Sequence, residues 1–233
     1  MLQKTRGLVL NHIRYQETSI IVKIYTEEFG LQSYIVNSVR SKNSKSNKIA
    51  LFQPLTLLEL VVYYNEKKSI NRISEQKCAH PFSSIPFNIV KSTLTMFIGE
   101  VLNKILSREE EANPLLFNFI FNSVKQLDET TDSLANYHIF FLLKFLSHLG
   151  IEPLSSESMY ESILTSYQGK NSAIILSNEE NLFINGILKN NTESKITHSE
   201  RKNILQFTLN FYYSQFENFG IIKSKDILAE VLG

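Results

Sequence analysis

The segment SIIVKIYTEEFG, residues 19–30, gives the clearest indication of the fold. Its first eight residues, Ser19–Thr26, are rich in β-branched side chains, which favour strands. Gly30 follows, and glycine can adopt the positive φ that a tight turn requires. We therefore predict a strand over Ser19–Thr26 that ends in a turn at Gly30.

Four more segments have the composition of strands. One precedes this strand and three follow it, in the order Leu8–Leu10, Leu31–Val39, Leu55–Tyr64 and Ser69–Gln76. The last two are separated by a turn at Asn65–Lys68. Five short strands with turn signals between them, within about eighty residues, are typical of a small barrel.

After Pro81 the apolar residues recur with a helical period. We predict helices over 89–105 and 115–127, the second capped by Asn113 with Pro114 in its first position. A third, capped by Asp132 or Ser133, should end at Gly150. Residues 151–196 are expected to be irregular and polar, with one strand-like pair at 173–176 and 182–184. Thr197–Glu200 is a capping box that opens a further helix, and a last helix follows near 224–231. The expected architecture is α+β, with a barrel domain over residues 1–80 and a helical domain over 81–233.

The net charge of +1 hides an asymmetry between these two parts. Residues 1–80 carry twelve Lys and Arg against six Asp and Glu, whereas residues 81–233 carry twelve against seventeen. A basic half beside an acidic half indicates a polyanionic partner for the basic one.

Several classes of protein are disfavoured by what the sequence lacks. The longest apolar run in its most hydrophobic segment is Ile139–Leu143, whereas a membrane span needs roughly 20 such residues. The apolar stretch Gly7–Leu10 is too short for a secretory signal, and the single Cys78 cannot form an intrachain disulfide or a cysteine-based zinc site. We therefore expect a cytoplasmic protein. No nucleophile motif, phosphate loop or metal-spaced histidine pair is present, so we also expect that it is not an enzyme and has no cofactor.

The cations of the first half gather where a polyanion could meet them. Between Phe29 and Pro54 the chain has four cations and no acid, and a solvated basic loop between strands cannot add to a core. Lys23 is predicted to point away from Ile20, Val22 and Ile24 on its strand. Cations that follow a phosphate backbone, with aromatic rings that stack on bases, make up a single-strand binding groove. The candidate nucleic-acid-binding residues are Arg14, Lys23, Tyr34, Arg40, Lys42, Lys45, Lys48, Lys67 and Lys68.

The same residues carry a resemblance to a known family. The runs Gly7–Leu10, Arg14–Glu17, Ile21–Gly30, Ser38–Lys42 and Phe52–Leu60 resemble, in order and spacing, the N-terminus of the bacterial DNA repair protein RecO family. The resemblance implies an OB-fold barrel followed by a helical domain. It further implies a recombination mediator that binds single- and double-stranded DNA, anneals complementary strands and, with RecR, helps to load RecA onto strands coated by single-strand binding protein.

Two further expectations come from the resemblance. Some members have a four-cysteine zinc site after the third helix, but residues 151–196 contain no cysteine, so we predict no zinc. The family also binds the acidic, Phe-ended tail of single-strand binding protein in its helical domain, which requires an apolar pocket beside a cation. Lys125 and Lys144 are the candidates for that cation.

Two alternatives remain open from the sequence. A different OB-fold protein, which binds RNA or takes part in translation, would share the basic face but would not anneal DNA. A non-enzymatic interaction scaffold would work through its helical domain and leave the basic loop unused.

Overall fold

The computed structural model describes residues 1–37, 39, 48–108, 111–167, 174–191 and 195–232. Within it the chain forms two compact units, Met1–Thr130 and Thr131–Gly233. Strands give way to helices near residue 80, where we predicted a domain boundary, but the first compact unit also contains two helices that follow the barrel.

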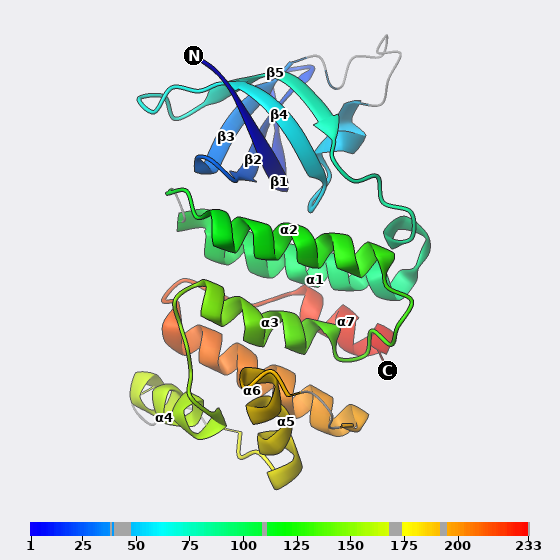
Figure 1. Ribbon diagram of the computed structural model, residues 1–233, viewed down its shortest axis with the longest axis vertical. Helices are drawn as coiled ribbons and strands as arrows, with labels where there is room; N and C mark the ends of the chain where they lie inside the picture. Colours follow the sequence, from blue (N-terminus) through cyan, green and yellow to red (C-terminus); the bar gives the residue numbers. More distant parts are fainter. Residues whose placement is uncertain (38, 40–47, 109–110, 168–173, 192–194, 233) are drawn as a thin grey trace. The chain divides into compact units, whose positions relative to one another are not determined.

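The first unit is built on a closed five-stranded barrel in the order β1–β2–β3–β5–β4 (Figure 1). The predicted barrel is therefore confirmed. All neighbouring strands are antiparallel except β3 and β5, which are parallel over only two residue pairs. The strands are β1 Leu2–Tyr15, β2 Ser19–Thr26, β3 Gly30–Val36, β4 Leu57–Tyr63 and β5 Asn71–Cys78.

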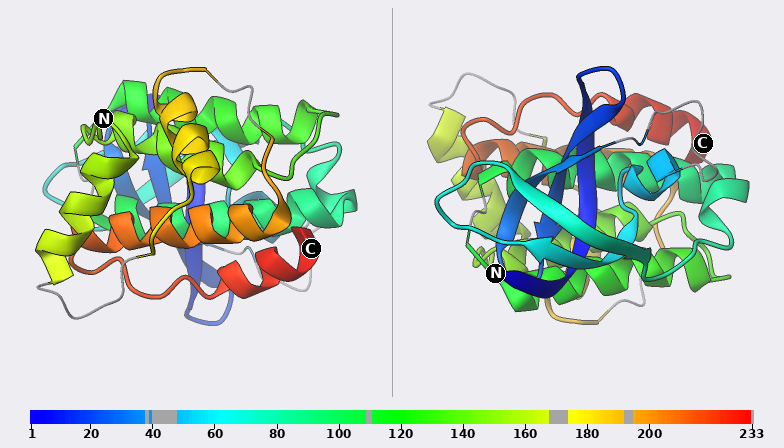
Figure 2. Two further views of the ribbon diagram at one scale, coloured as in Figure 1. Left: turned by 90° about the horizontal axis from the view of Figure 1, so that it is seen from below. Right: turned by 90° about the horizontal axis from the view of Figure 1, so that it is seen from above.

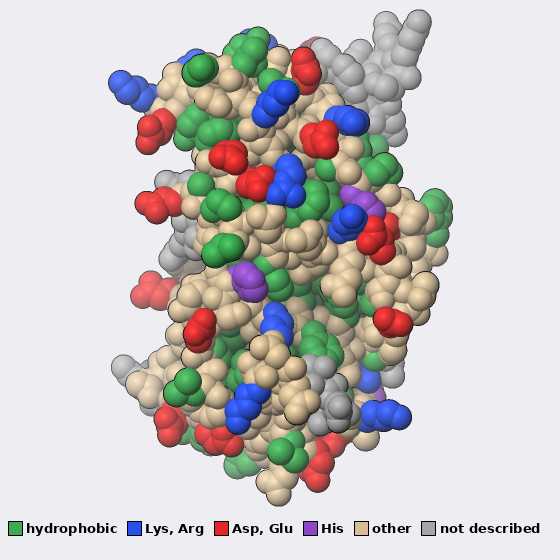
Figure 3. Space-filling model, in the orientation of Figure 1, with side chains coloured by type: hydrophobic (Ala, Val, Ile, Leu, Met, Phe, Trp, Pro, Cys, Tyr) green, Lys and Arg blue, Asp and Glu red, His purple; other side chains and the backbone are tan. Residues whose placement is uncertain are grey.

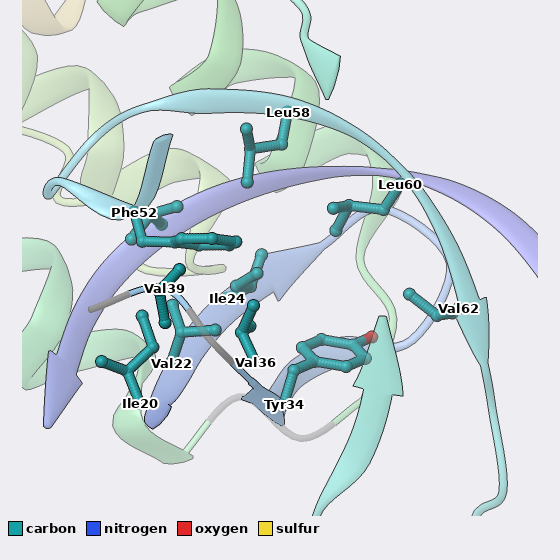
Figure 4. Close-up of a cluster of buried hydrophobic side chains, with 11 residues drawn as sticks. Ile20, Val22, Ile24, Tyr34, Val36, Val39, Phe52, Leu58, Leu60 and Val62 are labelled. Atoms are coloured by element: carbon teal, nitrogen blue, oxygen red, sulfur yellow. The ribbon is translucent and has the colours of Figure 1, made fainter. Parts of the chain in front are cut away.

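The barrel interior is filled by alternate residues of its strands, as a period of two requires (Figure 4). Ile20, Val22 and Ile24 of β2 point inward, and Leu58, Leu60 and Val62 of β4 do the same. Phe52, at the end of the short 3-10 helix η1 (Lys48–Phe52), completes this core. The outward residues of the same strands are thus the ones available to a ligand.

Two helices complete the first unit, α1 (Ile89–Ile105) and α2 (Pro114–Glu129). Asn113 caps α2 as predicted, since its side chain accepts a hydrogen bond from the Leu116 amide. Phe117 of α2 lies against Tyr25 on the outside of β2, with 6.1 Å between the ring centroids. α2 therefore covers part of the outer barrel surface.

A buried network ties the end of α2 to the start of α1. The Asp128 carboxylate accepts hydrogen bonds from the backbone amides of Ser83, Ser84 and Ile85, each at 2.9 Å. Lys91 is also buried, and its Nζ donates to the carbonyl oxygens of Asp128 at 2.8 Å and Thr130 at 2.7 Å. Both charges thus replace their lost hydration with hydrogen bonds, as buried charges must.

The second unit is helical throughout its described secondary structure. Its helices are α3 Tyr137–His148, α4 Ser156–Tyr167, α5 Asn178–Leu188, α6 His198–Gln215 and α7 Ser224–Leu232. The predicted cap of α3 at Asp132 or Ser133 is wrong, because the helix begins after Asn136. Its end is as expected, since Gly150 has a φ of 75°.

The predicted irregular segment at 151–196, with its strand-like pair, is also wrong. This segment contains α4 and α5, and the apolar residues near 182 belong to a helix whose buried face includes Phe183, Ile184 and Ile187. A capping box between Ser177 and Glu180 begins that helix. Ala173, one end of the predicted pair, lies outside the described residues.

Candidate nucleic-acid interface

The β1–β2 hairpin extends past the rest of the barrel. β4 pairs with β1 only from Leu2 to Leu8, so the part of β1 from Asn11 to Tyr15 is paired with β2 alone. A bulge at Leu10 separates the two parts, and such bulges bend a strand. In the right-hand view of Figure 2 the blue hairpin projects from the barrel. Near its tip Arg14 is exposed, and the Tyr15 side chain is 39% exposed.

The β4–β5 turn holds two further predicted cations, Lys67 and Lys68, both exposed. Asn65 shapes this turn, because its side-chain oxygen accepts from the Lys67 amide at 3.0 Å and its carbonyl oxygen accepts from the Lys68 amide at 3.0 Å. The buried Asn71 accepts in turn from the Asn65 amide at 3.0 Å. The turn is thus fixed to the barrel by two asparagines, and the backbone at both lysines is held in place.

The strand register connects this turn with the hairpin across the outside of the barrel. Ile13 pairs with Ile21, Ile21 with Ile35, Ile35 with Arg72, and Arg72 with Tyr63. We call these five residues the cross-barrel row. It begins in the projecting part of the hairpin, passes over β2 and β3, and ends at the base of the β4–β5 turn. Ile13 is 60% and Tyr63 is 53% exposed, so the row offers apolar and aromatic surface beside a guanidinium.

Lys23 lies next to the row on β2, paired with Asn11 on one side and Ser33 on the other, and it is exposed as predicted. The chain leaves β3 at Val36, directly after row residue Ile35. The predicted cations Arg40, Lys42 and Lys45 follow but lie outside the described residues, as does the side chain of Lys48.

Tyr34, predicted to stack on a base, is instead a core residue. It is fully buried, pairs with the inward-facing Val22, and its ring lies among the interior side chains in Figure 4. Burial raises the pKa of its hydroxyl well above the usual value. Tyr34 therefore cannot reach a ligand on the outer surface. Tyr63, by contrast, faces outward beside Arg72, and the sequence alone could not single it out because the register of the two strands was unknown.

A different outer face of the barrel carries charges of both signs. Arg6 donates from Nε to Glu27 Oε2 at 2.8 Å and from a terminal nitrogen to Oε1 at 2.6 Å, and its guanidinium lies 5.0 Å from the Phe121 ring centroid. The hydrogen bonds between them raise the pKa of Arg6 and lower that of Glu27. Acids and cations also alternate over the barrel in Figure 3. A cleft on the face that carries Arg6 and Glu27 is lined by residues that include Lys4, Glu28, Glu59, Glu75 and Lys77. The four carboxylates of this cleft outnumber its three cations, which gives it a net charge of about −1 and leaves the cross-barrel row as the better surface for DNA.

The two lysines proposed for the peptide tail differ in their surroundings. Lys125 is on the exposed side of α2, in an i,i+4 ion pair with Glu129 at 3.7 Å. Lys144 of α3 is partly buried, which lowers its pKa, and its Nζ donates to the Ile187 carbonyl at 2.7 Å and to the Asn190 side chain. It borders a cavity of about 460 Å³ whose apolar wall includes Ile151, Pro153, Leu154 and Leu188. Of these two lysines, Lys144 is the one that combines a cation with an apolar pocket.

Within the described ranges, no group of three or more His, Cys, Asp or Glu side chains is placed to hold a metal ion. In the same ranges, no helix has the length and apolar character needed to cross a membrane.

Comparison with known proteins agrees with this architecture. Residues 1–82 match the family model for the recombination protein O N terminal, and residues 86–159 match that for its C terminal. The chain belongs to the RecO family. This RecO-family chain is 36% identical to the DNA repair protein RecO of Flavobacterium psychrophilum, with 98% of each chain covered, and 35% identical to that of Phocaeicola vulgatus, with 99% of each covered. The OB-fold-like barrel is thus the N-terminal domain of a DNA repair and recombination family.

Proposed function

We propose that the chain is a recombination mediator that holds single-stranded DNA along the cross-barrel row. The observation that carries this proposal is the register itself, which links the β1–β2 hairpin and the β4–β5 turn through Ile21, Ile35 and Arg72. In OB folds, the face of strands 2 and 3 and the loops that flank it are the surfaces that bind oligonucleotides. Lys23, Lys67 and Lys68 are exposed next to that path and can follow the phosphates.

The row supplies the apolar contact that such a groove needs. Tyr63 and the neighbouring Arg72 can stack on bases, and base–aromatic stacking contributes roughly 1–3 kcal/mol per base in proteins of this kind. Because every base has a π face, this contact would be tolerant of sequence. A protein that anneals any two complementary strands needs that tolerance.

Membership of the RecO family supports the finer steps of the proposal. The chain would bind single- and double-stranded DNA, anneal complementary strands and act with a RecR-like partner to help load RecA onto coated strands. It would do so in the cytoplasm, without turnover chemistry and without a cofactor.

The cavity beside Lys144 is the proposed site for the acidic tail of single-strand binding protein. Its walls, which include Ile151, Pro153 and Leu154, can take an aromatic side chain, and the Lys144 ammonium can face a carboxylate. Two N–H groups of the Lys144 ammonium already donate to Ile187 and Asn190, which leaves its third N–H for the peptide. Lys125 remains a weaker candidate, because its charge is partly met by Glu129.

Strand annealing tests the proposal directly. Complementary oligonucleotides, bare or coated with single-strand binding protein, are mixed with the protein across a salt series. We expect annealing that weakens steeply as salt rises, because bound cations release counterions from DNA. Charge reversal of Arg40, Lys42, Lys45 and Lys48 should abolish it, and Tyr63→Ala with Arg72→Gln should weaken it at every salt concentration.

The same assay separates the alternatives. Binding without annealing would indicate a different OB-fold nucleic-acid binder. No binding at low salt, and no effect of the charge reversal, would indicate a scaffold that works through its helices. Lys4→Gln with Lys77→Gln, on the mixed-charge face, is the matched control that removes two cations and should leave annealing unchanged.

A further inference from the structure

A cavity in the second unit has the chemistry of an anion site but plays no part in the proposed function. It lies between α6 and α7, which run side by side in the left-hand view of Figure 2, and its volume is about 270 Å³. Arg201 and Lys202 of α6 and Lys225 of α7 border it. Both helices and His138 of α3 belong to the same compact unit, so the cavity is formed by that unit alone.

Two of the three cations, Arg201 and Lys225, are positioned by uncharged partners. Arg201 donates from Nε to the Asn136 side chain at 2.9 Å, and Lys225 donates to the Gln206 side chain at 2.8 Å. Glu200, which directly precedes Arg201, does not line the cavity, and its carboxylate accepts from the Thr197 amide at 2.6 Å. In the part of the chain that the structure describes, none of the three cations takes part in an ion pair.

The charge and the floor of the cavity together define the ligand. Asp226 is the one acid among its lining residues, so the three cations leave a net charge of about +2 there, which matches the −1.5 to −2 of a phosphate monoester at neutral pH. The floor is apolar, with the buried Leu205 and Leu228 at its base. His138 is buried beside them, and burial, followed by the charge of Arg201, lowers its pKa to about 3, so it adds no charge.

The size of the cavity restricts the ligand further. At about 270 Å³ it is near the lower limit of small-molecule pockets, roughly 300–1,000 Å³, and too small for a helix or a duplex. The side-chain amide of Asn203 lines it and can donate and accept hydrogen bonds, whereas the amide of Gln206 already accepts from Lys225 and donates to Asn210. An apolar floor for a ring, an amide for its edge and three cations for a dianion suit one nucleotide.

We propose that this cavity binds a nucleoside 5′-monophosphate, with the base on the leucine floor and the phosphate among Arg201, Lys202 and Lys225. The nucleotide is either free or the phosphorylated end of a DNA strand, since both present the same group. This site goes beyond the proposed function, because neither annealing nor tail binding requires it.

Calorimetric titration of the full chain with deoxyadenosine 5′-monophosphate tests the site. We expect saturable binding of one nucleotide per chain. Deoxyadenosine, which lacks the phosphate, and inorganic phosphate, which lacks the base, should each bind at least tenfold more weakly. Equal affinity for deoxyadenosine and its monophosphate, or no binding of the monophosphate, would overturn the proposal.

Variants locate the site within the molecule. Arg201→Gln with Lys225→Gln should weaken binding at least tenfold, and so should Ala229→Leu, which fills the floor and changes no charge. Lys195→Gln removes an exposed cation of the same unit that does not border the cavity and should change nothing. Unchanged affinity in both cavity variants, with melting curves like that of the wild type, would exclude this location.

A competition experiment then identifies the source of the nucleotide. If a 5′-phosphorylated oligonucleotide displaces the monophosphate and its 5′-hydroxyl counterpart does not, the cavity binds strand ends. If neither displaces it, the ligand is a free nucleotide. Lys67→Gln with Lys68→Gln should leave monophosphate binding intact, so a failure of the barrel interface would not be mistaken for a failure of this site.

Discussion

A methyl group added at Gly7 would have almost no room. Its carbon would lie 2.7 Å from Ile24 Cγ2 and 2.8 Å from Leu60 Cδ1, both buried in the closed barrel. We expect Gly7→Ala to lower the free energy of unfolding by about 1–3 kcal/mol, as overpacking of cores does. Gly99→Ala is the matched control: its nearest neighbour would be 3.6 Å away, in ordinary contact, and alanine favours a helix by up to about 1 kcal/mol. Urea unfolding measures both, and equal effects would contradict this account.

Lys67 and Lys68 should contribute to DNA affinity through charge alone. We expect Lys67→Gln with Lys68→Gln to weaken single-strand binding and to make the plot of log affinity against log salt shallower by about 1.4, or roughly 0.7 for each lysine that no longer neutralises a phosphate. Fluorescence anisotropy across a salt series measures the slope. Lys77→Gln, whose lysine lies 3.9 Å from Glu59, should leave the slope unchanged. A uniform loss of affinity with the slope of the wild type would show that the two lysines do not meet phosphates.

Tyr34 and Tyr63 of the barrel show what could not be predicted from the sequence at the residue scale. The alternation along β2 correctly placed Lys23 outside, because a period of two depends on local sequence only. Whether Tyr34 or Tyr63 faced a ligand depended on which side of each strand closes inward, and on the pairing of Tyr63 with Arg72. That pairing is between two different strands, so the sequence of neither strand alone shows it.

At the scale of elements, Asp128 joins α2 to the segment before α1. Asp128→Asn would replace an acceptor of three backbone amides and of the Ser83 hydroxyl with a neutral amide that also presents donors to them. Hydrogen bonds to charged groups contribute about 1.5–3 kcal/mol each, and we expect a total loss of about 3 kcal/mol because the asparagine can keep some of them. Glu129→Gln, in the exposed pair with Lys125, should cost less than about 1 kcal/mol. Chemical denaturation of the two variants tests the difference.

The same carboxylate should make stability depend on pH. Burial alone would raise the pKa of Asp128, but the backbone amides of Ser83, Ile85 and Ser84 and the His80 side chain hold it well below its usual range. A group with a lowered folded pKa stabilises the fold above its unfolded pKa, about 3.9 for Asp, and that contribution is lost as pH falls towards the folded pKa. We expect the wild type to lose more stability than Asp128→Asn between pH 5 and pH 2. Parallel pH profiles for the two proteins would refute this.

The helices α4 and α5 are the elements that could not be predicted from the sequence. The box at Thr197 was recognised because a helix of 18 residues follows it, whereas the equivalent box at Ser177 precedes only 11 helical residues. In so short a helix the apolar run Leu182–Ile184 reads equally well as a strand, since periodicity cannot separate the two over a few residues. Tertiary burial of Phe183, Ile184 and Ile187 decides the outcome.

At the scale of the whole molecule, charge and topology lead to the same surface by separate routes. The excess of cations in residues 1–80 was visible in the sequence, but it could not distinguish one barrel face from another. The strand order separates them, because it brings the cross-barrel row between two exposed loops and leaves Glu27, Glu28 and Glu75 on a different cleft. The net charge alone predicts a polyanionic partner, but it does not predict which surface of the barrel binds that partner.

The absence of cysteine between α3 and α6 leads to the last prediction, which concerns the stability of the whole chain. Some members of the family hold this region with zinc, whereas here the buried side chains of Met159, Ile163 and Phe183 can hold it by packing. We expect no stoichiometric zinc by elemental analysis, and a melting temperature that a chelator does not change. Phe183→Ala should instead lower stability by about 3–5 kcal/mol, as the loss of a buried aromatic ring does. A melting temperature that falls with chelator and recovers with added zinc would mean that metal, and not packing, stabilises this region.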